Sequence, residues 1–173
     1  MQKEMEPIQD EFKILPATRD DMQKVYDLIV ELAEYEKLRH MVIGDVKDME
    51  KWAFGEDPVV FINCGWLNGN IIAYSLHFRN YSTFLCKPGI YLEDIYVQPQ
   101  YRGRGYGKKM LLFLSKLCYE KGYGRMEWQV LKWNKPSIDF YESLGAEPLN
   151  EWLQYRLVGD SLKKCAENFD QLK

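Results

Sequence analysis

The spacing of apolar residues along the chain predicts short strands that alternate with amphipathic helices. Apolar side chains three and four positions apart indicate a helix that runs to Tyr35, whose start Thr18 or Asp20 can cap, and a second helix from about Met110 to Gly122. Weaker helical patterns cover residues 45–54, residues 134–145 and residues 160–172. Runs rich in β-branched and aromatic residues predict strands at residues 12–15, 59–66, 71–78, 90–97, 125–131 and 152–158, with a polar and aromatic loop at residues 80–87.

The order of these elements predicts a mixed sheet. Asn68 and Gly69 both tolerate positive φ and separate two strand patterns, which is typical of a tight antiparallel hairpin. The strand at residues 90–97 is followed by a helix and another strand, and such a connection makes the two strands parallel. The sequence therefore predicts an α/β fold with a mixed antiparallel and parallel central sheet flanked by helices. We expect a single domain over residues 12–173 behind a flexible tail of residues 1–11.

Composition narrows the classes of function. The chain has 173 residues, of which 46% are hydrophobic, and a formal net charge of −3. A nucleic-acid-binding domain is usually basic, so we expect no nucleic-acid partner. No apolar run is long enough to span a membrane. The four cysteines lie far apart without a C-x-x-C pair, which predicts idle thiols in the cytoplasm and no metal site.

A glycine-rich stretch after the strand at residues 90–97 carries the clearest chemical signal. Gly103, Gly105 and Gly107 occupy alternate positions just before a helix, and Arg102, Arg104 and Lys108 flank them. The first N–H groups of a helix are unpaired, and glycine lets a phosphate approach them closely. The stretch therefore predicts a phosphate-binding loop; the alternative is a plain strand-to-helix turn.

Two common phosphate-binding motifs fit this loop poorly. A P-loop has four residues between its glycines and then Lys-Ser or Lys-Thr, whereas Gly107 and Lys108 are followed by Lys109. A dinucleotide-binding fold needs G-x-G-x-x-G early in the chain, and here the spacing is G-x-G-x-G past the middle. Glu127 lies where a ribose-binding acid would be expected, but too little chain follows to complete a doubly wound sheet.

The loop and three further stretches resemble a known family. Residues 101–107 (YRGRGYG) match the pyrophosphate loop of the GNAT N-acetyltransferases, which bind acetyl-CoA. Residues 31–38 (ELAEYEKL), 91–97 (YLEDIYV) and 133–137 (WNKPS) resemble the diamine acetyltransferase branch, and within it the thialysine N-ε-acetyltransferases. The resemblance runs from about Phe12 to Val158. It implies a homodimer and acetyl-CoA as the cosubstrate.

The resemblance also implies a set of site residues. Those expected to bind acetyl-CoA are Ile95, Tyr96, Val97, Arg102, Gly103, Arg104, Gly105, Tyr106, Gly107, Lys108, Asn134, Lys135, Pro136, Ser137 and Tyr141. Those expected to bind the amine are Tyr35, Glu36, Glu93, Glu127, Trp128, Gln129 and Glu151. For Tyr35 and Glu36, ordinary solvated surface is the alternative. The chain is short between Gly145 and Trp152, so the register of Glu151 is open.

Acetyl transfer to an amine needs a base, because an alkyl ammonium with a pKa near 10.4 is rarely neutral at pH 7. Glu93 is the candidate base, acting directly or through a water. In a regular strand Asp94 points to the opposite face and is then a structural or exposed acid, unless a bulge turns the strand. Backbone N–H groups near Ile95 to Val97 can stabilise the oxyanion if the strand is open there. The family context of residues 134–137 makes Tyr141 the candidate acid for the leaving thiolate; the alternative is a core tyrosine.

These residues and the resemblance predict direct acetyl transfer from acetyl-CoA onto the primary amine of a small molecule. The loop at residues 80–87 contains no acid, whereas polyamine-specific relatives carry one there. An amino acid such as thialysine or lysine is therefore expected ahead of spermidine or spermine. The alternatives are a polyamine acetyltransferase, a protein or peptide N-acetyltransferase and a non-catalytic acyl-CoA-binding protein.

Overall fold

A computed structural model describes residues 11–171 of the chain, which form two compact units with a boundary after Gln129. The prediction of a single domain over residues 12–173 stays a prediction, and the predicted tail of residues 1–11 lies almost wholly outside the described residues. No helix among residues 11–171 is long and apolar enough to cross a membrane.

The first unit contains a five-stranded sheet. Its strands lie in chain order, β1 to β4 pair antiparallel, and β5 pairs parallel to β4. The predicted mixed sheet is thus confirmed. The strands are β1 (Phe12–Pro16), β2 (Phe61–Leu67), β3 (Asn70–Ser82), β4 (Lys87–Val97) and β5 (Met126–Trp128).

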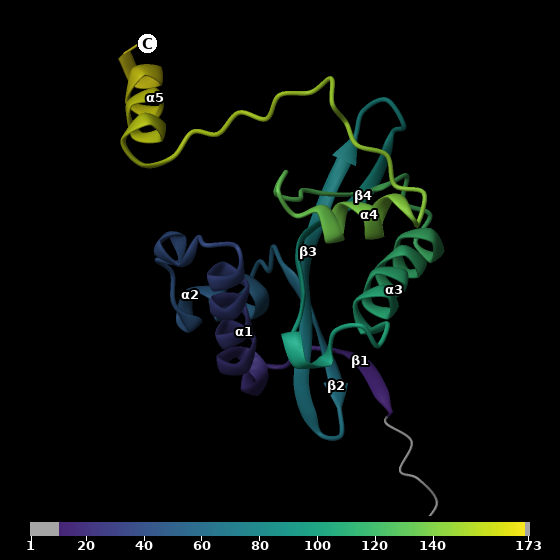
Figure 1. Ribbon diagram of the computed structural model, residues 1–173. Helices are drawn as coiled ribbons and strands as arrows, with labels where there is room; N and C mark the ends of the chain where they lie inside the picture. Colours follow the sequence, from purple (N-terminus) through teal and green to yellow (C-terminus); the bar gives the residue numbers. More distant parts are fainter. Residues whose placement is uncertain (1–10, 172–173) are drawn as a thin grey trace, which may run out of the picture. The chain divides into compact units, whose positions relative to one another are not determined.

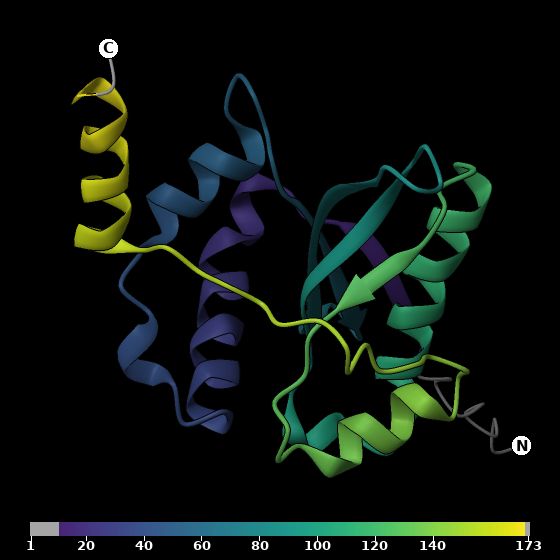
Figure 2. The same ribbon diagram turned by 90° about the horizontal axis from the view of Figure 1, so that it is seen from above.

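Helices cover both faces of this sheet. Figure 1 shows α1 (Met22–Tyr35) and α2 (Val46–Phe54) on one face and α3 (Tyr106–Glu120) on the other, and Figure 2 shows the same layers from above. Single 3₁₀ turns precede or follow these helices at Arg19–Asp21, Arg39–Met41 and Pro99–Tyr101. We call the two surfaces of the sheet the α1 face and the α3 face.

Each face has its own hydrophobic core. On the α1 face, Val25 and Leu28 of α1 pack against Tyr74 and Tyr96, and all four side chains are buried. On the α3 face, Met110 belongs to a cluster with strand residues that include Ala73 and Val97. Two layers of helices on one sheet bury apolar surface on both sides, which is the main source of stability for such a domain.

Local sequence explains the ends of several elements. Asn68 has φ 50° and Gly69 has φ 78°, so the predicted hairpin between β2 and β3 is confirmed. Thr18 caps the 3₁₀ turn that leads into α1, through a reciprocal contact with Asp21, rather than α1 itself. Asp45 caps α2, because its side chain accepts a hydrogen bond from the N–H of Asp48.

The second unit contains α4 (Lys135–Glu142) and α5 (Gly159–Gln171). Asn134 caps α4 as expected, since its side chain accepts a hydrogen bond from the N–H of Ser137. Gly145 has φ 86° and follows the end of α4, in the conformation that glycine adopts most readily.

Three of the predicted segments, two strands and one loop, are wrong in whole or in part. Residues 152–158 form no strand in the described chain, because alternating apolar residues make a strand only where a neighbouring backbone pairs with them, and no ladder is formed there. The strand expected at residues 125–131 is only Met126–Trp128 long. The loop expected at residues 80–87 is mostly ladder, since β3 runs to Ser82 and β4 begins at Lys87.

Candidate active site

The glycine loop has the backbone of an anion site. Gly103 and Gly105 have φ of 75° and 80°, and Gly105 is the N-cap of α3. A Cβ added at either position would meet no heavy atom within 4 Å, so the space beside the loop is open. Gly107 differs from them because it lies in the first turn of α3 and has no positive φ. A Cβ added at Gly107 would lie 3.7 Å from a methyl group of Val97. There is therefore open space beside the N-terminus of α3, where a helix has unpaired N–H groups.

The cations of the loop are arranged less uniformly than the sequence suggested. Arg104 and Lys108 are exposed, as expected of phosphate ligands. Arg102 instead donates a hydrogen bond from Nε to the carbonyl oxygen of Val97, at 2.9 Å. The ring of Tyr106 is buried and stacks on Phe12 with centroids 4.4 Å apart, so only the backbone of Tyr106 is available to a ligand.

Strand β4 has a free edge beside this loop. Within the first unit its ladder with β5 ends at the pair of Leu92 and Trp128, so residues 93–97 are not paired to β5. The side chains of Ile95 and Val97 pack on the α3 face and that of Tyr96 on the α1 face. Any contact of these three residues with a ligand therefore comes from the backbone, as the sequence analysis expected for an oxyanion site.

A β-bulge interrupts β4 at Glu93. Asp94 pairs with Leu76 of β3 and Leu92 pairs with His77, so Glu93 has no partner in β3. In this β-bulge, β4 has one more residue than β3 between the two neighbouring pairs, and the extra residue bends β4 locally.

The bulge puts two acidic residues on one face. Asp94 is two positions from Tyr96, which packs on the α1 face. Tyr91 pairs with Phe78, which lies two positions from Leu76 and so points to the α1 face as Leu76 does. Glu93 is in turn two positions from Tyr91. Because side chains alternate along a strand, both Glu93 and Asp94 face α1. In a regular strand Asp94 would point to the face opposite to that of Glu93. Instead it shares the face of Glu93, and it is half-buried rather than exposed.

Asp94 is held by a tyrosine that the sequence analysis did not single out. The hydroxyl of the fully buried Tyr74 donates a hydrogen bond to Asp94 Oδ2 at 3.1 Å. The pKa of Asp94 is raised to about 6, chiefly by burial and in addition by the neighbouring carboxylates of Glu93 and Glu36, although the hydrogen bond from Tyr74 acts to lower it. Partial burial likewise raises the pKa of Glu36. Glu93 and Glu36 therefore both lie within electrostatic range of Asp94.

The C-terminal half of α1 is connected to the end of β4. Glu31 accepts a hydrogen bond from Gln98 Nε2 at 2.9 Å and one from the hydroxyl of Tyr96 at 3.3 Å. Tyr35 is the last residue of α1 and Glu36 is its C-cap. Neither Glu31 nor Gln98 carries a sequence signal for this contact, since the two residues are 67 positions apart.

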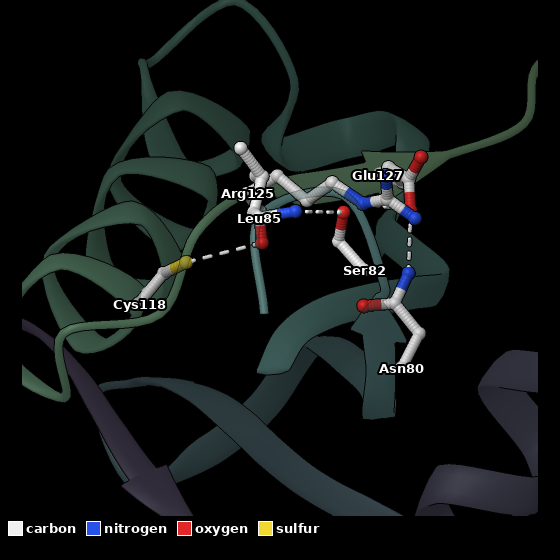
Figure 3. A network of polar contacts seen from close by, with 6 residues as sticks. All are labelled: Asn80, Ser82, Leu85, Cys118, Arg125 and Glu127. Carbon is white, nitrogen blue, oxygen red and sulfur yellow. Dashed lines mark hydrogen bonds and ion pairs between the residues drawn. The ribbon is translucent and has the colours of Figure 1, made fainter. Parts of the chain in front are cut away.

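Glu127 lies on β5 and is already paired. Its Oε2 atom accepts from Arg125 Nε at 2.9 Å and from the side-chain amide of Asn80, as Figure 3 shows. The same close-up shows Ser82 accepting a hydrogen bond from the N–H of Leu85, which closes the turn between β3 and β4. The ion pair with Arg125 offsets the charge of Glu127, so this acid attracts an ammonium or a ribose less than a free carboxylate would. Trp128 ends β5 and Gln129 follows it.

The remaining expected site residues belong to the second unit. Asn134 is buried, and Lys135 at the start of α4 forms an ion pair with Asp139. Pro136 and Ser137 lie in the first turn of α4, as expected. The half-buried Tyr141 lies on the same helix, its ring centroid 5.4 Å from that of Phe140, and Glu151 is exposed in a turn beyond α4.

Comparison with known proteins identifies the family. Residues 22–146 match the model of the acetyltransferase (GNAT) family. The chain belongs to the GNAT family of acetyltransferases. Mouse thialysine N-epsilon-acetyltransferase is 35% identical over 167 residues, which cover 89% of this chain and 96% of the relative. Arabidopsis thaliana L-ornithine N5-acetyltransferase NATA1 is 44% identical over 98 residues, 56% of this chain and 43% of the relative.

Solved structures share the GNAT fold. An aminoglycoside N-acetyltransferase in complex with CoA has a TM-score of 0.69 and 19% sequence identity, covering 90% of this chain and all of that one. The expected GNAT-like fold is thereby confirmed, as is the expectation that the protein is an N-acetyltransferase.

The first unit fits the cosubstrate that GNAT enzymes use. A pyrophosphate needs N–H donors and cations, and the glycine loop with Arg104 and Lys108 offers both. The pantetheine arm of CoA contains two amide groups, and the unpaired edge of residues 93–97 can hydrogen-bond to amides as a neighbouring strand would. Acetyl-CoA supplies the acetyl thioester when it is bound.

The raised pKa of Asp94 predicts a pH-dependent cost in stability. An acid whose pKa is higher in the folded protein than in the unfolded one destabilises the fold when it is ionised, and this penalty disappears as the pH falls through the window from about 6 to about 3.9. Replacing Asp94 with Asn is therefore expected to raise the free energy of unfolding at pH 7, by at most about 3 kcal/mol, and to change it little at pH 4. Urea unfolding at both pH values measures this.

The matched control for that measurement is Asp57→Asn, which changes an exposed acid in the loop after α2. Its effect is expected to be small at both pH values. A loss of stability in Asp94→Asn at pH 7 would show that the ionised carboxylate is a net stabilising partner of Tyr74, contrary to this reasoning.

Proposed function

We propose that the protein transfers the acetyl group of acetyl-CoA directly to the side-chain amine of a thialysine-like or lysine-like amino acid. The observation that carries this proposal is the bulge at Glu93, which puts Glu93 and Asp94 on the α1 face together with Glu36, next to the open edge of β4. Carboxylates at that place attract an ammonium group to the strand edge where a thioester would lie.

Glu93 is the proposed base. It is exposed, so it can exchange protons with solvent, and it is the bulged residue beside the unpaired strand edge. In the proposed step a proton leaves the ammonium through Glu93 or a bridging water, and the neutral nitrogen forms a bond to the acetyl carbon. Asp94 and Glu36 favour binding of the cation, which also raises the pKa of the amine, so proton release to solvent is part of the step.

The other groups act on the oxygen and the sulfur. Backbone N–H groups of residues 95–97 are the proposed donors to the carbonyl oxygen, where negative charge develops. Tyr141 is the proposed acid, which gives its proton to the sulfur as the carbon–sulfur bond breaks, and the second proton that the nitrogen loses as the amide forms replaces it through solvent. Its support is the family resemblance of residues 133–137 together with its place on α4, the helix that Asn134 caps.

Two features support an amino acid as the acceptor. The names of the mouse and Arabidopsis relatives describe acetylation of a side-chain amine of an amino acid, at N-epsilon and at N5. The turn between β3 and β4 consists of Thr83, Phe84, Leu85 and Cys86, with no acid to repel a substrate carboxylate.

A polyamine is the second candidate, and a different observation favours it. Glu36 and Glu93 lie close enough to Asp94 to raise its pKa, and such a concentration of negative charge suits a substrate with more than one ammonium group.

The proposal also includes the state and the location of the protein. The family resemblance supports a homodimer, and four cysteines that form no disulfide support the cytoplasm.

The substrate proposal predicts the outcome of a direct comparison. Thialysine, and lysine more weakly, should be acetylated at the side-chain amine with a higher kcat/KM than spermidine. Lysine should be the poorer of the two amino acids because its amine is more basic and less often neutral. Initial rates of CoA release with each amine at equal concentrations measure this. A preference for spermidine or spermine would replace the amino-acid proposal with the polyamine one.

The glycine loop predicts a selective loss of cosubstrate binding. Gly105→Val introduces a β-branched side chain at φ 80° and fills the open space beside the N-terminus of α3. The affinity for acetyl-CoA should fall at least about tenfold, measured by calorimetry.

The matched control for that variant is Gly122→Val. Gly122 also has positive φ, 67°, and open space around it, but it follows the other end of α3. It should cost similar stability without changing acetyl-CoA affinity. Equal affinities in the wild type and Gly105→Val would remove the glycine loop from the proposed site.

The proposed acid predicts a loss of turnover without a loss of binding. Tyr141→Phe removes the phenolic proton and keeps the ring, so kcat should fall by about 10²–10⁴-fold while the affinity for acetyl-CoA changes little. Tyr119→Phe, on the exposed surface of α3, is the control that should leave kcat unchanged. A kcat within about twofold of the wild type would mean that water protonates the thiolate.

A further inference from the structure

Arg102 does not point away from the protein as a simple phosphate ligand would. Its guanidinium carbon lies 4.7 Å from the ring centroid of Tyr35 and 5.3 Å from that of Tyr96, while its Nε is bonded to the carbonyl oxygen of Val97. The first residue of the glycine loop is thus in contact with the last residue of α1. Arg104 lies two positions along the loop and contacts a different part of the chain. Its guanidinium lies over the ring of Tyr101, 5.8 Å from the ring centroid, in the 3₁₀ turn just before the loop.

A second contact joins the same two parts of the chain. Glu31 lies four residues before Tyr35, on the same side of α1. It accepts hydrogen bonds from the hydroxyl of Tyr96 and from Gln98, at the end of β4 just before the glycine loop. The end of α1 is therefore held to β4 and the loop at two points one helical turn apart, with Tyr96 shared between them.

The residues held in this way adjoin both halves of the proposed site. Glu36, a proposed amine-binding acid, immediately follows Tyr35 as the C-cap of α1. Lys37 follows with φ 62°, and the helix end is closed there by backbone hydrogen bonds from Glu36 to Leu32 at 2.9 Å and from Leu38 to Ala33 at 2.7 Å. Glu36 therefore moves with the end of α1, and the contact of Tyr35 with Arg102 ties that end to the glycine loop.

The chemistry of arginine suits this contact better than that of lysine. A guanidinium is planar, stacks on aromatic rings and donates from Nε at the same time, whereas an ammonium is a point charge that can do only part of this. An exposed cation–π contact contributes about 0.5–1 kcal/mol, which corresponds to roughly a two- to fivefold change in an equilibrium constant.

We propose that Arg102 is a positioning residue for the amine: through Tyr35 it fixes the end of α1 that presents Glu36, and so couples amine binding to occupation of the glycine loop. This inference rests on the proposed function and adds to it a role for Arg102 beyond attraction of the pyrophosphate. The coupling is reciprocal, because any ligand of the loop that orders Arg102 also orders Tyr35, and the amine does the same in return.

The experiment compares Arg102→Lys with Arg104→Lys, two substitutions that keep the charge of the loop. Initial rates give both KM values and kcat, with whichever of thialysine and spermidine is the better substrate as the amine. Arg102→Lys should raise the KM of the amine about two- to fivefold at saturating acetyl-CoA. Arg104→Lys should change only the KM of acetyl-CoA.

Variants of Tyr35 test the same contact from the helix. Tyr35→Leu removes the ring and should raise the KM of the amine as Arg102→Lys does, and the double variant should show no further increase. Tyr35→Phe keeps the ring over Arg102 and should raise the KM of the amine less than Tyr35→Leu does. An amine KM that Arg102→Lys leaves unchanged, or effects of Arg102→Lys and Tyr35→Leu that simply multiply, would overturn the inference.

A binding measurement separates this inference from the proposed function. Calorimetry gives the dissociation constant of the amine with and without saturating CoA. The wild type should bind the amine more tightly with CoA present, and Arg102→Lys should lose that difference. A wild type that acetylates the amine but shows no difference would overturn the coupling alone. A wild type that neither binds acetyl-CoA nor acetylates any amine would overturn the proposed function itself.

Discussion

The bulge at Glu93 is the constraint on which the candidate site depends. One extra residue in β4 changes which side chains face α1 from that point to the end of the strand. Without it, Glu93 and Asp94 would lie on opposite faces, and the α1 face would hold only one of them. The bulge also marks the place where β5 leaves β4, so an open backbone edge and two acids occur together.

Placing acids there costs stability. Asp94 is half-buried beside Glu93 and within range of Glu36, and it accepts a hydrogen bond from Tyr74. A fold optimised for stability alone would put apolar or neutral groups at this position. Proteins retain such destabilising charges chiefly at functional sites, where the charge acts on a ligand. The raised pKa of Asp94 is therefore an energetic sign of function as well as a geometric consequence of the bulge.

The glycine loop and helix α1 form one connected arrangement rather than two separate binding elements. Tyr96 is packed in the core of the α1 face, and its hydroxyl and ring contact Glu31 and Arg102. The loop that GNAT enzymes use for acetyl-CoA is thus joined through a buried strand residue to the helix end that carries Tyr35 and Glu36. In the proposed mechanism, this connection is the path by which the two ligands affect each other.

The sequence by itself determined the elements whose signals are local. The helical spacing of α1 and α3, the Asn68-Gly69 turn and the cap of α4 all depend on neighbours within a few residues, and each was predicted correctly. It failed at residues 152–158, because a strand requires a partner backbone that no local pattern specifies. Only the tertiary structure decided that Asp94 shares a face with Glu93, that Tyr74 holds it, and that Arg102 contacts Tyr35. Each of these depends on strand register or on contacts between residues distant in the chain, and a shift of one residue in register would have reversed them.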